Sequence, residues 1–331
     1  MSEGVVCTRG GIEESRHVVH GVVVDGSGRR LAQVGEPGTV AFFRSAAKPI
    51  QALPVVDDGV AERFGLGEDE LALCCASHNA EPRHLEVAAS ILRKAGLGPD
   101  DLECGPHPPM RDEVSAELYR EGGEPRPIHN NCSGKHAGML ALAVTRGWPT
   151  RGYVGASHPV QRRMLEEVCR WTELDEAAVG TGTDGCGVVS FAVPLERMAR
   201  AFGRLATAAR SGDPGPRAVV GAMTGHPFLV AGTGRLCTAL MERAGDRLFV
   251  KTGAEGVYCA GVPGRGLGVA VKVEDGARRA SDVALLEILG ELELLDDDDL
   301  EALGTFHRPP VRNTRGERVG ELRAAFDLRR G

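Results

Sequence analysis

The chain has 331 residues, of which 42% are hydrophobic and 26% are charged, and its formal net charge is −7. This balance is typical of a globular protein with material for one large two-lobed domain or two smaller ones. The acidic charge argues against nucleic acid or an anionic membrane as the main partner, so a small-molecule substrate is expected.

The sequence also predicts the compartment. The first residues lack a basic segment followed by an apolar run, and no stretch reaches the roughly 18 uninterrupted apolar residues that a membrane span needs. Nine cysteines without a dense framework suit a reducing environment better than a disulfide scaffold. We therefore expect a cytoplasmic protein.

The N-terminal part predicts antiparallel strands over residues 17–24 and 30–34, joined by a turn at 25–28. Residues 39–43 then lead into Ser45, which is expected at or near the start of a helix. Pro49 fits only in the first turn of that helix.

Apolar residues recur at helical spacing through the middle of the chain, which predicts helices over residues 68–75, 82–95, 112–119, 134–145 and 159–171. A glycine-rich loop over 180–187, a strand over 188–193 and a helix over 195–208 are expected to follow. The C-terminal part predicts strands over 247–252, 256–261 and 267–273 and a helix over 281–292. The acidic run 296–299 is interpreted as a solvated loop or a helix cap.

This order of strands, helices, strands and helix predicts an α+β fold, with an antiparallel sheet flanked by helices and an all-helical lobe. We expect one two-lobed catalytic domain over residues 1–331. Its sheet lobe would comprise about 1–60 and 245–331, and its helical lobe about 61–245.

Three short strings carry the chemistry. They are Ser45-Ala46-Ala47-Lys48, Ser77-His78-Asn79 and Lys251-Thr252-Gly253, which form an S-x-x-K, S-x-N and K-T-G series. A serine hydroxyl attacks a carbonyl only when a base takes its proton, and lysine serves when burial or a second cation lowers its pKa. Lys48 and Lys251 could have this effect on each other. Only five of the 39 basic residues are lysines, and arginine cannot replace lysine as a base.

Other residues are candidates for a metal or a substrate. Cys132 and His136 are four residues apart and would face one side of a helix, where Cys186 could complete three metal ligands. The alternative is that Cys132 and Cys186 are buried thiols that bind no metal. An amino-acid substrate needs a cation and an anion, for which Arg44 and Asp184 are candidates. Alternatively, Arg44 forms an ion pair at the surface or at a strand end, and Asp184 stabilises a turn.

The layout resembles the serine β-lactamase and penicillin-binding-protein fold. A closer similarity, to the Rhizobium-etli-type L-asparaginase family (asparaginase II-like), is carried by strings that span nearly the whole chain. They are RSAAKPIQALP (44–54), ASHNAEPRHL (76–85), CGPHPP (104–109), NNCSGKHAGMLA (130–141), TDGCGVVSFAVPL (183–195), KTGAEGVYCAG (251–261) and RNTRGERVGELR (312–323).

The resemblance implies hydrolysis of the side-chain amide of L-asparagine to L-aspartate and ammonia by a homodimer. It pairs Ser45 with Lys48 and Ser77 with Lys251, and it implies a zinc ion on Cys132, Lys135 and Cys186. Substrate-binding candidates are Arg44, Asn79, His136, Asp184 and Cys237, with His136 also the alternative zinc ligand.

We hypothesise that Ser45 attacks the amide while neutral Lys48 accepts its proton, and that Ser77 and Lys251 pass a proton to the departing ammonia. Ser77 is the rival nucleophile. The alternative functions are a serine-dependent glutaminase, another β-lactamase-like acyl-serine amidase and a non-catalytic zinc or amino-acid binding protein. A threonine nucleophile within 180–184 lacks a partner threonine near the amino terminus.

Overall fold

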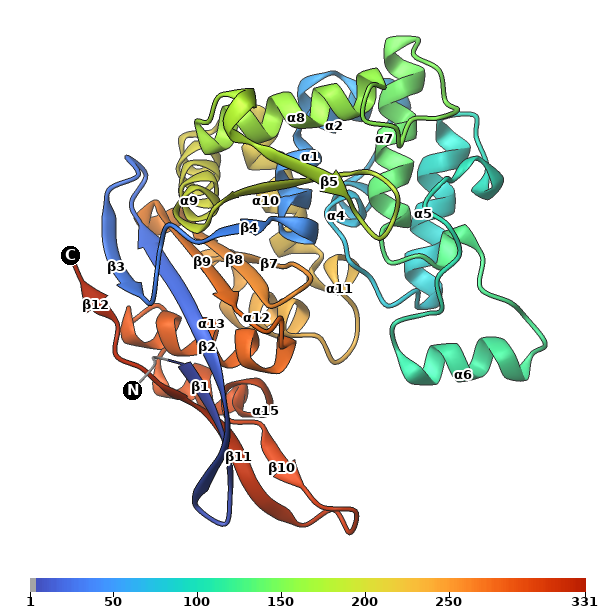
Figure 1. Cartoon of the computed structure of the whole chain (residues 1–331). Helices are drawn as coiled ribbons and strands as arrows, with labels where there is room; N and C mark the ends of the chain where they lie inside the picture. Colours follow the sequence, from blue (N-terminus) through green and yellow to red (C-terminus); the bar gives the residue numbers. More distant parts are fainter. Residues whose placement is uncertain (1–3) are drawn as a thin grey trace. The chain divides into compact units, whose positions relative to one another are not determined.

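The computed structural model describes residues 4–331 and divides into two compact units. The first unit runs to Ala46 and includes Val193–Thr207 and Val250–Gly331, whereas the second comprises Ala47–Ala192 and Ala208–Phe249. Together they give a mixed α/β architecture with a large antiparallel sheet and many helices (Figure 1).

The first unit is built on a nine-stranded sheet. Seven strands follow the order β10-β11-β1-β2-β9-β8-β7, and β3 pairs with both β2 and β12. The pairings of β1 with β2 and β11, of β2 with β3 and β9, and of β8 with β9 are antiparallel. The bounds are β1 Gly4–Arg9, β2 Ile12–Val24, β3 Arg30–Val34, β7 Phe249–Thr252, β8 Val257–Val262, β9 Leu267–Val273, β10 Pro310–Arg312, β11 Arg318–Ala325 and β12 Arg329–Arg330.

Valine-rich strands form the core of this sheet. Every residue of β8 is buried, and α13 (Arg278–Glu291) packs on β9, β2 and β8. Helix α9 (Leu195–Ser211) approaches β9 closely at Gly268, where an added Cβ would lie 1.9 Å from the Ala199 carbonyl oxygen. Glycine is therefore required at this helix–strand contact.

The second unit is mainly helical. Its helices are α1 Lys48–Gln51, α2 Leu53–Asp57, α3 Val60–Phe64, α4 Glu68–Cys74, α5 Pro82–Lys94, α6 Asp112–Arg120, α7 Ser133–Arg146, α8 Pro159–Thr172, α10 Pro214–Gly225, α11 Pro227–Val230 and α12 Leu236–Ala244. Helix α7 packs against α2, α3, α4, α5 and α8. A Cβ at Gly134 would lie 2.3 Å from the Leu73 carbonyl oxygen, so the small residue lets the first turn of α7 cross the end of α4.

Some local expectations were wrong. Residues 180–183 were expected in a loop, yet they form strand β5 (Gly180–Thr183), which pairs antiparallel with β6 (Val189–Pro194). The glycine-rich sequence gives no sign of a strand, because this strand is stabilised by backbone hydrogen bonds to its partner. Strands β10 and β11 and helix α10 were not predicted. The acidic run does cap a helix: Asp296 Oδ1 accepts from Asp299 N at the start of α14 (Asp297–Ala302).

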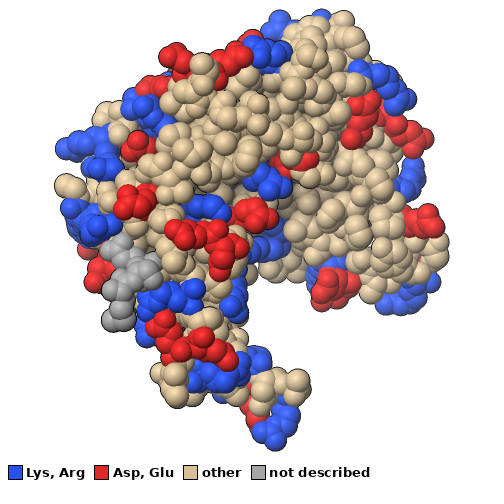
Figure 2. Space-filling view, viewed as in Figure 1, with Lys and Arg blue, Asp and Glu red and all other residues tan. Residues whose placement is uncertain are grey.

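Charged side chains of both signs are interspersed on the face drawn in Figure 2. Strands β1, β2, β10 and β11 carry many of them in pairs, such as Arg9 with Glu14 and Arg318 with Glu321. Within residues 4–331, no helix combines the length and the apolar character needed to cross a membrane.

Candidate active site

Ser45 follows strand β4 (Val40–Phe42) and lies in the short helix η1 (Arg44–Ala47). Phe43 is fully buried and packs against Phe202, which anchors the chain just before the serine. Arg44 then takes a left-handed backbone conformation, with φ at 50°. A non-glycine residue in this region costs of order 1–3 kcal/mol and is common at functional sites. The half-buried Ser45 is therefore presented by a strained, well-anchored turn.

The K-T-G string lies beside this turn within the first unit. A Cβ at Gly253 would lie 3.0 Å from the Phe43 carbonyl oxygen and 2.9 Å from the Val257 Cβ, so only glycine fits there. Lys251 is fully buried on β7, and its Nζ donates to the Thr252 carbonyl oxygen at 2.9 Å. The close approach of Gly253 to Phe43 places the K-T-G string beside the turn that carries Ser45. The pairing of Lys251 with Ser77, which belongs to the second unit, stays a prediction.

Lys48 contacts Ser77 inside the second unit. Its Nζ lies 3.0 Å from Ser77 Oγ and 2.5 Å from the Ala76 carbonyl oxygen. Lys48 is fully buried, and burial lowers its pKa, with a smaller contribution from the charge of Lys135 and an opposing one from the thiols of Cys132 and Cys186. The environment thus favours a neutral amine beside a serine hydroxyl. The pairing of Lys48 with Ser45 stays a prediction.

The Ser77-His78-Asn79 segment is held on both sides. Ser77 N donates to the Val230 carbonyl oxygen, and His78 N donates to that of Asn131. His78 Nδ1 accepts from Ala80 N, so its Nε2–H donates to Ser133 Oγ at 2.9 Å. Burial lowers the pKa of His78 well below its ordinary value. His78 therefore acts as a neutral support for the segment.

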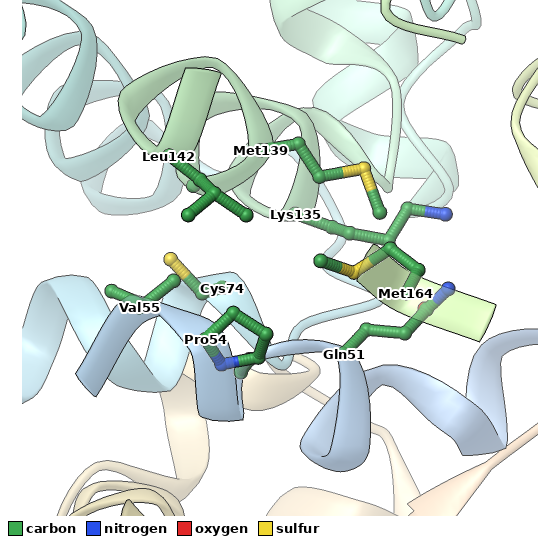
Figure 3. Close-up of a pocket in the computed structure, with 10 residues that line it drawn as sticks. Gln51, Pro54, Val55, Cys74, Lys135, Met139, Leu142 and Met164 are labelled. Atoms are coloured by element: carbon green, nitrogen blue, oxygen red, sulfur yellow. The ribbon is translucent and has the colours of Figure 1, made fainter. Parts of the chain in front are cut away.

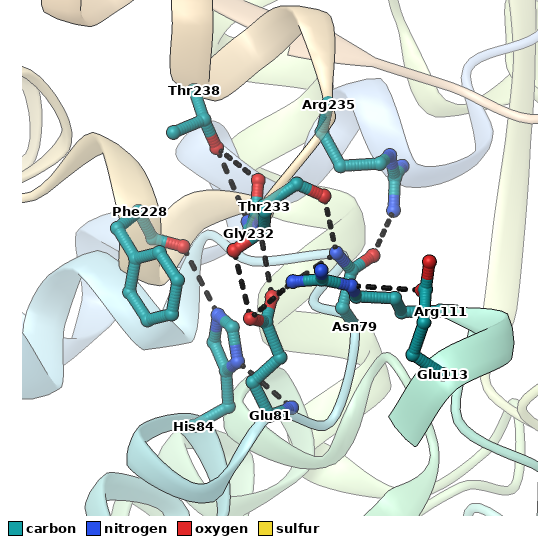
Figure 4. Close-up of polar contacts among 10 residues, drawn as sticks. All are labelled: Asn79, Glu81, His84, Arg111, Glu113, Phe228, Gly232, Thr233, Arg235 and Thr238. Atoms are coloured by element: carbon teal, nitrogen blue, oxygen red, sulfur yellow. Dashed lines mark hydrogen bonds and ion pairs between the residues drawn. The ribbon is translucent and has the colours of Figure 1, made fainter. Parts of the chain in front are cut away.

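Asn79 is tied into a buried polar cluster around Glu81 (Figure 4). Its Nδ2 donates to the Thr233 carbonyl oxygen and to Glu81 Oε1, while its Oδ1 accepts from Arg235 at 3.0 Å. Arg235 also donates to the Ser77 carbonyl oxygen at 3.3 Å. Asn79 and the Ser77 carbonyl oxygen thus share Arg235 as a donor, and a role of Asn79 in substrate binding stays a prediction.

Glu81 fastens two further segments to this cluster. Its carboxylate accepts from Thr233 N and Thr233 Oγ1, and it forms an ion pair with Arg111, which directly precedes α6. These hydrogen bonds outweigh burial and lower the pKa of Glu81. Helix α6 has no buried residue, and the ion pair ties the residue just before it to Glu81.

Two thiols and an amine meet where the family resemblance implies a zinc ion. Lys135 Nζ donates to Cys186 Sγ at 3.2 Å, and all three of Cys132, Lys135 and Cys186 are buried. The hydrogen bond between the thiols lowers the pKa of Cys186 to about 5 and raises that of Cys132 to about 12. Burial alone would lower the pKa of Lys135, but the negative charge of the thiol pair raises it.

This donor set suits a soft metal ion only in part. Thiolates are preferred zinc ligands, and the two thiols are already in contact. No group of three His, Cys, Asp or Glu side chains among residues 4–331 could hold a metal, so Lys135 would have to lose its proton and serve as the third ligand. Without a metal, the Lys135 ammonium pairs with the Cys186 thiolate, and the Cys132 thiol donates a hydrogen bond to the same thiolate.

Asp184 shapes the loop that presents Cys186. Asp184 N donates to the Val188 carbonyl oxygen and Gly187 N donates to that of Asp184, which closes a tight turn around Cys186. The carboxylate also interacts electrostatically with Lys135 and with His136. Asp184 thus forms a turn and lies near the cluster, and its role in substrate binding stays a prediction.

His136 is fully buried in the first turn of α7 and lies near the charges of Lys135, Cys132 and Lys48. Burial lowers its pKa to about 3. Its Nδ1 is 2.7 Å from the hydroxyl of Tyr153, and the two rings meet edge to face.

Cys237 is buried in the first turn of α12, two residues beyond Arg235.

A small cavity is lined in part by Lys135 (Figure 3). Its lining is mostly apolar, including Val55, Cys74, Leu142 and Met164, and the amine of Lys135 points away from Leu142 and Val55. Its volume is about 10 Å³, which is close to the room one water molecule needs. This cavity is therefore too small to hold an amino acid.

Comparison with known families decides the class of protein. The sequence model of the family described as L-asparaginase II matches residues 5–324. The chain belongs to the L-asparaginase II family. This confirms the asparaginase II-like family expected from the motifs, and it supports an amidohydrolase. A comparison with curated proteins finds no match.

Solved structures of a protein called Mglu are similar to this L-asparaginase II family member. Its native form in 4.3 M NaCl is 16% identical, with a TM-score of 0.37, and the alignment covers 85% of this chain and 63% of that one. Its L-glutamate binding form gives the same identity and TM-score and 61% coverage of that chain. The chain thus spans less than two thirds of the length of these two chains.

Sequence reasoning missed three residues near the candidate groups: Glu81, Tyr153 and Arg235. Arg235 follows Gly232 and Gly234, two glycines with positive φ, and this pattern was the available signal of a constrained loop. Glu81 and Tyr153 lack any such local signal.

Proposed function

We propose that this family member is an L-asparagine amidohydrolase that uses a lysine-activated serine. The observation that carries the proposal is that buried Lys48, which lies three residues after Ser45 in the chain, contacts Ser77 Oγ. Family membership supports amide hydrolysis as the reaction class. The β-lactamase-like fold, the homodimer and the cytoplasmic location are further proposals that rest on the resemblance and the composition.

Lys48 has the right groups for a general base. A neutral amine has two N–H groups and one lone pair, and the Ala76 carbonyl oxygen takes one N–H because it can only accept. The lone pair is then available to a serine hydroxyl proton. Ser77, at 3.0 Å, is within range to exchange a proton with it.

In the proposed reaction, Ser45 Oγ bonds to the side-chain amide carbon while its proton passes to Lys48. The C–N bond then breaks, and the proton that Lys48 took passes through Ser77 and Lys251 to the nitrogen, which leaves as ammonia. A water oxygen bonds to the carbonyl carbon of the resulting ester while the C–O bond to Ser45 breaks, one water proton goes to Ser45 Oγ, and L-aspartate is released. The bonds and protons balance with water as the only co-reactant.

Zinc binding by Cys132, Lys135 and Cys186 is a separate proposal, supported by the contact of these donors. A bound zinc ion would act as a Lewis acid toward a substrate oxygen. The protein residues by themselves neutralise one another and fix the loop around Asp184 next to the first turn of α7.

The first experiment measures ammonia release from L-asparagine and L-glutamine side by side, with Ser45→Ala protein in the same assay. Selective release from L-asparagine that the substitution abolishes is the expected result. Preference for L-glutamine would favour the glutaminase alternative, since one methylene is worth only about 1–3 kcal/mol in a pocket. Absence of release from both amides would contradict the proposal.

Metal analysis tests the zinc proposal directly. We expect about one zinc ion per chain in the purified protein, as in other sites with three protein ligands. Cys186→Ser should remove most of it, whereas Cys169→Ser, on the partly exposed face of α8, should leave the content unchanged. Equal zinc contents in the wild type and the Cys186→Ser protein would show that these residues do not hold it.

A further inference from the structure

Tyr153 connects a loop to the candidate site through a single hydroxyl. The side chain is fully buried, and its backbone carbonyl accepts from Gln161 at 3.0 Å, which holds the loop against α8. The hydroxyl lies 3.0 Å from Glu103 N and 2.7 Å from His136 Nδ1. No other hydrogen bond of this hydroxyl occurs within the described residues 4–331.

These two contacts fix where the protons are. A backbone N–H can only donate, so Glu103 N donates to the Tyr153 oxygen. The tyrosine proton then has a single acceptor, the lone pair of His136 Nδ1. A neutral imidazole carries one proton, and that proton must be on Nε2.

His136 Nε2 is left as a buried donor. It has no hydrogen-bond partner in the part of the chain that the structure describes, although His136 is fully buried. A buried donor without a protein partner is rare in folded proteins, and a bound ligand, ion or water is one explanation for it. The neighbours of His136 include Lys48, Lys135 and Asp184, all of them candidate site residues.

We propose that Tyr153 is a positioning residue that holds His136 as the Nε2–H tautomer, aimed at an oxygen atom of the bound amino-acid amide. The inference deepens the proposed function and rests on it for the identity of the substrate. In this tautomer Nε2 has no lone pair, so His136 is a hydrogen-bond donor and neither a zinc ligand nor a general base.

The tautomer is tested without turnover. Full-length protein labelled with ¹⁵N-histidine is examined by imidazole NMR, and the His136 signals are assigned by their loss in His136→Gln protein. We expect a protonated Nε2 and an unprotonated Nδ1 in the wild type, and a mixture of tautomers in Tyr153→Phe protein. A proton on Nδ1, or a metal-bound Nε2, in the wild type would overturn the proposal.

Substrate contact is tested on Ser45→Ala protein, which should bind the amide without consuming it. L-Asparagine or L-glutamine at saturation should shift the His136 Nε2–H signal, and an unchanged signal would overturn the proposed contact. In otherwise native protein, Tyr153→Phe should lower kcat/KM about tenfold, mainly through a higher KM.

Tyr258→Phe is the matched control, because it removes the hydroxyl of another buried tyrosine, on β8. The two variants should lose similar thermal stability, but only Tyr153→Phe should change KM and the His136 spectrum. Equal kinetic effects would reduce Tyr153 to a structural residue. Should the wild type hydrolyse neither amide, the amidohydrolase proposal fails, while the NMR result still decides the tautomer.

Discussion

Lys48→Met should lower kcat for amide hydrolysis by about 10³-fold, within the range that a general base contributes. Methionine keeps the length and apolar stem of lysine but offers no lone pair of comparable basicity to the serine proton. Lys48 is fully buried, and its Nζ contacts Ser77 Oγ and the Ala76 carbonyl oxygen. The measurement is initial rates of ammonia release at saturating amide.

Two further variants separate base chemistry from charge and packing. Lys48→Arg keeps a cation that cannot lose its proton, so it should be as inactive as the methionine variant. Lys94→Met removes a lysine that pairs with Glu70 at 2.6 Å in the same unit, and it should lower stability more than kcat. Substantial activity in the arginine variant would contradict a role for Lys48 as base.

The sequence named the candidate groups but not their contacts. Motif order singled out Lys48 and Ser77 as candidates, and the structure brings these two within hydrogen-bond distance. The family resemblance paired Ser45 with Lys48 and Ser77 with Lys251, and both pairings stay predictions, because a motif names the members of a site without fixing which side chains meet. That choice depends on how α1 packs beside the loop after α4, which is a long-range property.

The supporting residues could not be predicted for the same reason. Glu81 accepts hydrogen bonds from Thr233, and Tyr153 meets His136, yet neither pair is adjacent in sequence or linked by a helical or strand period. Strand β11 was also missed, since its burial alternates only weakly and its position is set by pairing with β1. By contrast, the helices with strong apolar periodicity, such as α5 and α8, agree with the expectation within a few residues.

Ser77→Ala should lower kcat by about 10²-fold but leave acylation at Ser45, because a proton relay can be replaced partly by water, whereas a nucleophile cannot. Acid-quenched turnover mixtures, digested and examined by mass spectrometry, would locate the aspartyl ester. We expect it on Ser45 in the wild type and in Ser77→Ala protein, and on no serine in Ser45→Ala protein.

Ser190→Ala provides the matched control for this comparison, since Ser190 is buried in β6 and its hydroxyl has no partner within residues 4–331. It should keep wild-type turnover. The contact of Ser77 with Lys48 makes the opposite assignment chemically reasonable, because the same amine could activate Ser77 directly. An ester on Ser77 that persists in Ser45→Ala protein would therefore transfer the role of nucleophile to Ser77 and leave Lys48 as its base.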